Sequence, residues 1–462
     1  MKLFFRNFYL VFLFVLFPLF AYAQDSKDLN LDELLSMDKP VEEKKEDPFS
    51  RMLKQAKWTW TTNAYSFVQS KSGQDAGDDK KNQQINMQLF FDANYKTKDF
   101  ELKIDFLGWI GTEKDSFWPS NPDTSRSANF TQIYLKKDLE NSNLFLGYKQ
   151  VEDGISTLFS PANHLARVDS LVPTDSIKLG VWQAAWVGYD GNNTTELRLL
   201  PYFQESRVPA KISRWSSKDS NQHLVGVEDQ GDLKNNEVED KKISHRLQDM
   251  GGFFKRKMRV AGADFLASAY YGYLPNSSIK RTVKDYRTKY ERVHVKGAIL
   301  ATGVSAVKGS WELHGEAALQ IPENRKDDSF LKYVGGFEYD TNLFLKIDGI
   351  ETAKLVIEYA NEWVITEQNH PEYPYRTHTA RVGRNSIFLL QKVDINDKNK
   401  LFYGFTYNIS KDDNWHRIGG EHKFGTANSI ELAYEWFNGK DNTQFGRWHE
   451  NDRLILKFTK KF

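Results

Sequence analysis

The sequence predicts an all-β protein, a transmembrane antiparallel up-and-down β-barrel of about 18 strands (range 16–18), with a short N-terminal periplasmic segment. Three observations predict this fold. Apolar and polar residues alternate along many segments, the connections between these segments are alternately short and long, and the chain ends in an aromatic residue. Alternation with a period of two indicates strands, because successive side chains of a strand point to opposite faces.

The composition excludes some classes of protein. The 462 residues are 27% charged and 40% hydrophobic, with a mean hydropathy of −0.61, so a bundle of transmembrane helices is excluded. A barrel tolerates this polarity because half of each strand faces water, and the aromatic content of 14% suits its two girdles. An aromatic-rich soluble β-sandwich is the alternative.

The net charge of +1 gives no reason to expect a nucleic-acid partner, and the absence of Cys excludes disulfides and thiolate metal sites.

Residues 1–23 have the pattern of a secretory signal peptide. Lys2 and Arg6 precede an apolar run, and Ala21-Tyr22-Ala23 forms a small-x-small cleavage site. An uncleaved N-terminal anchor is the alternative. Residues 24–56 are polar and predict a periplasmic tail or pore-plugging segment, with one short helix near residues 29–37.

Residues 57–462 are predicted to form the barrel. Each predicted strand is close to the roughly 9–11 residues that a tilted membrane strand needs. The segments lie near 58–68, 83–97, 99–110, 127–137, 143–150, 179–189, 194–203, 248–257, 260–273, 292–307, 310–321, 330–340, 352–364, 379–393, 400–410, 415–424, 429–437 and 452–462.

The connections are predicted to sort by side of the membrane, because short periplasmic turns and long outer loops are typical of outer-membrane barrels. Two connections depart from this pattern, a long one at 340–349 and a short one at 411–414. The long segments are 69–82, 111–126, 151–178, 204–247, 274–291, 322–329, 365–378 and 438–451.

The last predicted strand ends in Phe462, with Leu454, Leu456 and Phe458 on the same face. This ending resembles the signal that the outer-membrane assembly machinery reads on barrel proteins, although Lys460 stands where an apolar residue is usual. The resemblance implies that this machinery is a partner, together with outer-membrane lipid.

The third long loop, within residues 147–181, carries a motif made of Gly147, Lys149, Gln150, Gly154, Pro161, Asn163, Arg167, Asp169, Lys178 and Gly180. This motif resembles a passage in porin-like families, including alginate-export-type outer-membrane proteins. Asp153 stands where these families have Trp, which leaves the subfamily and the substrate open.

In general porins the third loop folds into the lumen, so residues 151–178 are expected to narrow the pore. Charges of both signs at a constriction set ion selectivity. The alternative is that they brace the loop against the barrel wall. The constriction candidates are Glu152, Asp153, Arg167, Asp169, Asp175 and Lys178.

Strand residues on the polar face are expected to line the lumen. Their mixed signs fit either an ordinary solvated face or a mild preference for cations. The candidates are Glu101, Lys103, Asp105, Glu312 and Glu316.

The sequence gives little indication of an enzyme, because the ten His residues do not have the spacing of a zinc protease and no G-x-S-x-G motif of a serine hydrolase occurs. We therefore expect no catalytic residues and no cofactor. His314 shares a strand face with Glu312 and Glu316, which could form a metal site, but an ordinary polar wall is the preferred interpretation.

These observations predict a channel in the outer membrane of a Gram-negative bacterium, through which small hydrophilic solutes diffuse passively. One alternative is a non-conducting binding or structural barrel that acts through its long outer loops. A less favoured alternative is an outer-membrane hydrolase. The sequence leaves oligomerisation open.

Overall fold

The computed structural model describes most of the chain from residue 52 onward, all of it within the unit Pro48–Phe462. The predicted signal peptide and nearly all of the predicted tail lie outside the described residues. No helix in the described part is long and apolar enough to cross a membrane. The described residues are 52, 54–68, 82–112, 125–170, 172–209, 213–215, 238–241, 243, 246–340, 350–376 and 381–462.

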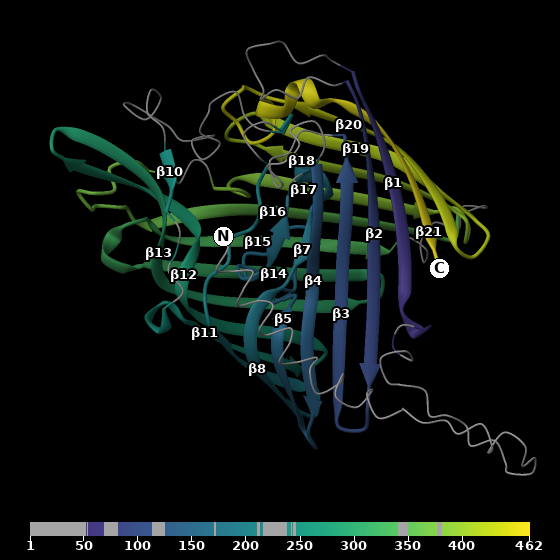
Figure 1. The fold of residues 1–462 in the computed structure, drawn as a ribbon, viewed down its shortest axis with the longest axis horizontal. Helices are drawn as coiled ribbons and strands as arrows, with labels where there is room; N and C mark the ends of the chain where they lie inside the picture. Colours follow the sequence, from purple (N-terminus) through teal and green to yellow (C-terminus); the bar gives the residue numbers. More distant parts are fainter. Residues whose placement is uncertain are drawn as a thin grey trace, which may run out of the picture. The chain divides into compact units, whose positions relative to one another are not determined.

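Eighteen of the described strands form the wall of a closed antiparallel β-barrel (Figure 1). Each wall strand pairs with the next one along the chain, and β1 pairs with β21 to close the ring. The predicted antiparallel barrel of about 18 strands is therefore confirmed, and every predicted segment corresponds to one wall strand. The wall consists of β1 (Lys57–Phe67), β2 (Gln83–Lys96), β3 (Phe100–Gly111), β4 (Ser125–Asp138), β5 (Ser142–Lys149), β8 (Val181–Asp190), β9 (Asn193–Leu200), β11 (Gly251–Val260), β12 (Ala263–Lys284), β13 (Arg287–Lys308), β14 (Trp311–Pro322), β15 (Ser329–Asp340), β16 (Thr352–Thr366), β17 (Ser386–Asp394), β18 (Asn399–Asn408), β19 (Asp413–Phe424), β20 (Asn428–Asn438) and β21 (Arg453–Lys461).

The two faces of the wall are inverted relative to a soluble protein. On β20, the outward side chain of Leu432 is 53% exposed, whereas the inward Glu435 is fully buried. The same contrast holds on β21 between the exposed Leu454 and the buried Arg453. An apolar exterior around a polar lumen is the arrangement that a barrel in a lipid bilayer requires.

Three short strands lie outside the wall, and none was predicted, because three residues are too few to show alternation. β6 (Arg167–Asp169) and β7 (Ile177–Leu179) pair with each other, and β10 (Val238–Asp240) runs parallel to β13. Short 3₁₀ turns occur at η2 (Pro173–Asp175), η5 (Leu247–Asp249), η6 (Glu323–Arg325) and η9 (Gly446–Asn451).

The hairpin of β12 and β13 corrects one prediction. Residues 274–291 were expected to form a loop, but both strands continue to a tight turn at Asp285 and Tyr286, which have φ values of 51° and 61°. The register shifts after Tyr273, which breaks the alternation that the sequence could reveal. Figure 1 shows this hairpin extending beyond its neighbours, with β10 beside it.

The start of β17 corrects another prediction, which placed the strand from residue 379. The strand begins at Ser386, because Gly383 (φ 80°) and Asn385 (φ 47°) adopt left-handed conformations that a strand cannot contain.

An arginine on the outer face of the wall should destabilise the barrel more than one on the lumenal face. Leu89 and Gln88 are neighbours on β2, and strand alternation places Leu89 with the exposed Ile85 and Met87. We expect Leu89→Arg to lower the free energy of unfolding in lipid vesicles by about 2–4 kcal/mol, because a charge faces hydrocarbon. Gln88→Arg is the control. Equal losses in urea titrations of the two variants would contradict the assignment of faces.

Candidate functional site

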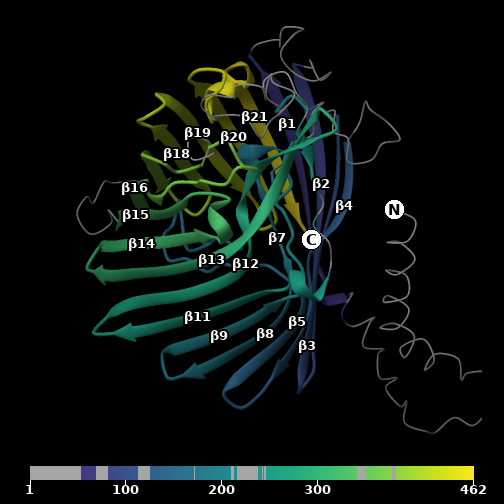
Figure 2. The same ribbon diagram turned by 90° about the vertical axis from the view of Figure 1, so that its left-hand side faces the viewer.

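The connection between β5 and β8, residues 150–180, lies inside the barrel and is called here the lumenal loop. Its short strand β7 falls within the ring of wall strands in both views (Figures 1 and 2). The loop begins with Gln150, whose backbone N–H donates to Gln132 on β4. It ends at Gly180, whose N–H donates to the carbonyl of Thr131, also on β4.

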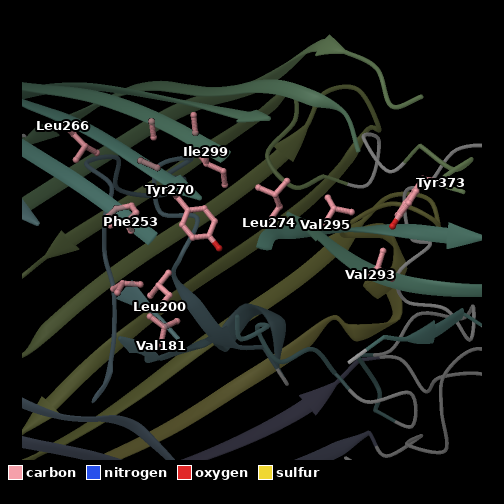
Figure 3. Close-up of a cluster of buried hydrophobic side chains, with 14 residues drawn as sticks. Val181, Leu200, Phe253, Leu266, Tyr270, Leu274, Val293, Val295, Ile299 and Tyr373 are labelled. Carbon is pink, nitrogen blue, oxygen red and sulfur yellow. The ribbon is translucent and has the colours of Figure 1, made fainter. Parts of the chain in front are cut away.

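Apolar packing holds the first half of the loop against the wall. Val151 and Ala162 are buried against inward side chains of β8 to β14, and Ile155 and Leu165 pack on the same cluster. Figure 3 shows the wall side of this cluster, including Phe253, Leu266, Tyr270 and Ile299. Apolar side chains on a lumenal face are unusual in a water-filled barrel, and here the loop covers them.

Asp153 adds an ionic anchor to this apolar contact. Its side chain is fully buried, and its two carboxylate oxygens accept hydrogen bonds from Arg198 of β9 at 2.8 and 2.6 Å. Lys255 of β11 donates to the same carboxylate at 2.6 Å. These two cations outweigh the burial and lower the pKa of Asp153 from 3.8 to about 2. Asp153 therefore braces the loop against the wall.

Glu358 on β16 binds the backbone of the lumenal loop directly. Its carboxylate accepts the N–H groups of Thr157 at 2.8 Å, Leu158 at 3.0 Å and Phe159 at 2.7 Å. Nε2 of His314 lies 2.9 Å from the same carboxylate. Three backbone donors that no strand satisfies are thus satisfied by one buried acid.

Glu316 on β14 does the same for the adjoining residues. It accepts the N–H groups of Ile155, Ser156 and Ala162 and the hydroxyl of Ser160. Gly154 is required beside this contact, because a Cβ there would lie 1.8 Å from Oγ of Ser160 and 2.8 Å from Oε1 of Glu316. This steric limit gives a physical reason for the glycine in the third-loop motif.

The second half of the loop reaches a different part of the wall. Asp175 accepts hydrogen bonds from Arg417 of β19 at 2.8 Å and from Arg453 of β21 at 3.0 Å. Thr174 donates to Glu435 of β20 at 3.0 Å. The two guanidinium groups hold the pKa of Asp175 below its usual range. The loop is therefore anchored to strands β9 to β16 at one end and β19 to β21 at the other.

The other predicted constriction residues are also paired. Arg167 donates to the hydroxyl of Tyr148 at 2.7 Å, and Asp169 pairs with Arg207. Glu152 and Lys178 form an ion pair with each other, and each side chain is 61% exposed. Among the six predicted residues, this pair is the most open to solvent, whereas Asp153 is fully enclosed.

The five predicted lumen residues lie in two separate groups, one on β3 and one on β14. Lys103 on β3 pairs with Asp92 at 2.6 Å and with Asp105 at 3.0 Å, and Glu101 accepts a hydrogen bond from Asn94. None of the contacts described for this group involves the lumenal loop.

Glu312 and Glu316 share a face of β14 but have different partners. Glu312 accepts a hydrogen bond from Ser305 at 2.7 Å, whereas Glu316 binds the loop. His314 between them is paired with Glu358, and no group of acids and histidines in the described residues has a metal-binding arrangement.

Sequence reasoning missed three of the wall cations that hold the loop, Lys255, Arg417 and Arg453. The only local signal is their alternation with outward residues on the same strands, which places them on the lumenal face but does not indicate a partner. Their partners lie 102, 242 and 278 residues away in the chain.

A second connection crosses to the same region of the wall. Arg214, in the segment after β9, is fully buried. Its guanidinium carbon lies 3.9 Å from the ring centre of Phe67 on β1. Its Nε donates a hydrogen bond to Asn451 at 2.9 Å. The carbonyl of Trp215 accepts a hydrogen bond from Trp448 at 2.9 Å. Connections from two neighbouring hairpins thus converge on the strands beside the β1–β21 seam.

Comparisons with known proteins give likenesses among solved structures. The outer membrane protein OpdK from Pseudomonas aeruginosa is 10% identical, with a TM-score of 0.46 over 88% of this chain and 99% of that chain. A BenF-like porin from Pseudomonas fluorescens Pf-5 is 10% identical, with a TM-score of 0.48 over 89% and 99%. OccAB3 from Acinetobacter baumannii is 9% identical, with a TM-score of 0.47 over 88% and 99%. No family model matches the chain, and no curated protein matches it.

Replacing each wall carboxylate by its amide should expose the loop amides that it binds. We expect Glu358→Gln to speed hydrogen exchange about tenfold at residues 157–159, because a hydrogen bond to a charged acceptor is stronger than one to a neutral acceptor. Glu316→Gln should do the same at residues 155–156 and at Ala162.

The matched control is Glu312→Gln, which changes the same face of β14 away from the loop. Exchange measured by mass spectrometry should be unchanged at residues 155–162 in this variant. Uniform acceleration over the loop in all three variants would show that the carboxylates do not act on separate amides.

The anchor at Asp153 should depend on pH in a defined window. Its pKa is lower in the folded state than the ordinary value of 3.8, so its stabilisation is present above that value and is lost as the pH falls toward about 2. The difference corresponds to about 2 kcal/mol. Asp153→Asn should lose this amount at neutral pH and converge with the wild type near pH 2.

The exposed Glu152 provides the comparison for this measurement, because a surface ion pair contributes little. Urea unfolding of Glu152→Gln should follow the wild type at every pH. If Asp153→Asn also followed the wild type at neutral pH, the ionic anchor would not stabilise the fold.

Proposed function

We propose that this protein is a channel in the bacterial outer membrane through which small hydrophilic solutes diffuse passively. The observation that carries the proposal is a loop held across a polar lumen by anchors on two parts of the wall. Such a loop narrows a pore, and its backbone donors have partners there. The export signal at residues 1–23 and the periplasmic tail belong to the same proposal, as does recognition of the Phe462 strand by the assembly machinery.

Glu152 and Lys178 are the residues that we assign to the constriction. They place one charge of each sign on the exposed side of the loop. Asp153, Asp175, Arg167 and Asp169 are assigned to holding the loop, because their partners lie in the wall or in neighbouring segments. The resemblance of the third-loop motif to alginate-export-type proteins belongs to the same proposal and leaves the substrate open.

One observation favours a second candidate, a non-conducting barrel that binds ligands through its outer loops. Both the lumenal loop and the segment containing Arg214 and Trp215 reach the strands beside the seam. Two connections crossing one lumen could close it. Planar-bilayer recordings separate the two candidates, because only the channel gives stable unit conductance; its consistent absence from folded protein would remove the channel proposal.

Ion selectivity tests the constriction residues. Reversal potentials in a salt gradient should shift toward anions for Glu152→Gln and toward cations for Lys178→Gln, because each change leaves the opposite charge unbalanced. Lys103→Gln is the control, since that ion-paired lysine lies on β3 outside the loop. Opposite shifts in the first two variants support the assignment. No shift in either of them would move the constriction elsewhere.

A further inference from the structure

A recess of about 190 Å³ lies where the lumenal loop meets residues 202–208 and the outer parts of β12 and β13. By the volume that water occupies in the liquid, it has room for about six water molecules, the space of one ring-sized solute. It lies toward the long connections, on the side from which a solute in the outer medium would arrive.

Aromatic rings form much of the recess wall. The ring of Phe203 lies 4.7 Å from that of His294 and 6.1 Å from that of Tyr273. His164, from the lumenal loop, lies 5.3 Å from Tyr270. These rings come from three separate parts of the chain, and their flat faces suit the apolar face of a ring-shaped solute.

Glu205 and Arg292 of the recess are paired with each other. Glu205 accepts a hydrogen bond from Arg292 at 2.7 Å, and Arg292 also donates to Asp240 at 2.7 Å. The guanidinium of Arg167 donates to two neutral acceptors, the hydroxyl of Tyr148 and the backbone carbonyl of Glu205. A charged solute that binds Glu205 or Arg292 would have to separate their ion pair, at a cost in desolvation that a neutral solute avoids.

One polar side chain of the recess nevertheless remains available to a ligand. Neither ring nitrogen of His164 has a hydrogen-bond partner of good geometry within the described residues, whereas Nε2 of His294 lies 3.2 Å from the carboxylate of Glu205. Buried nitrogens such as those of His164 are costly to leave unsatisfied, and the hydroxyl groups of a solute would satisfy them.

We propose that this recess binds a neutral polyhydroxylated solute of monosaccharide size. Apolar ring faces stack on Phe203 and its neighbours, while hydroxyl groups at the edges bond to the imidazole of His164. The inference rests on the proposed channel function, to which it adds the solute class. The recess would select by shape and hydroxyl pattern before the solute passes the constriction.

The test is equilibrium binding to the full-length mature protein in detergent, observed by saturation-transfer NMR. The probes are glucose, glucuronate and glucosamine, which share a six-membered sugar ring and differ in charge. We expect glucose to bind more tightly than both ionic analogues. Glucuronate or glucosamine binding at least as tightly as glucose, or no binding of any probe, would overturn the proposal.

A pair of variants locates the binding. Phe203→Ala should weaken glucose binding about tenfold through loss of the stacking face, and Phe203→Trp should retain it. Phe90→Ala removes a similarly half-buried ring from the lumenal face of β2 and should have no effect. Equal losses in Phe203→Ala and Phe90→Ala would overturn the assignment to the recess.

The binding assay does not depend on conduction, so the two proposals can fail separately. Glucose binding without bilayer conductance would remove the channel and keep the recess. Conductance without glucose binding would keep the channel and remove this inference.

Discussion

The structure depends on satisfying the backbone of a loop that lies inside a barrel. A strand donates its N–H groups to its neighbours, but residues 155–162 have no neighbouring strand, and unsatisfied donors in an enclosed space are costly. Glu316 and Glu358 supply the missing acceptors from two strands of the wall. The wall thus does more than enclose the lumen, because its inward carboxylates fix the shape of the chain that crosses it.

The loop uses its own acids in the opposite way. Asp153 and Asp175 are paired with cations of the wall, one near the start of the loop and one in its second half. Acids of the wall bind the loop and acids of the loop bind the wall, so each buried charge has a counter-charge or a set of donors. This balance leaves few exposed charges on the loop. The exposed Glu152 and Lys178 are for that reason the residues that we assign to the constriction.

The sequence was sufficient for the wall strands because their signal is local. The alternation on β20 or β21 is visible within ten residues, and the closing pair follows from the count of strands. The extension of β12 and β13 was missed where the register shifts, and β17 was started too early across left-handed residues. The roles of Arg417 and Arg453 could not be predicted, because their partner Asp175 is remote in the chain and only the folded barrel brings them together.

The seam between the first and last strands has one further property. Val172 of the lumenal loop packs in the same buried cluster as Tyr65 of β1 and Ile455 of β21, and Arg453 beside them binds Asp175. Contacts that exist only when both terminal strands are in place add their free energy to the joined state. The loop therefore links the first and last strands. Closure of the barrel and binding of the loop are thermodynamically coupled, so a change that destabilises one also destabilises the other.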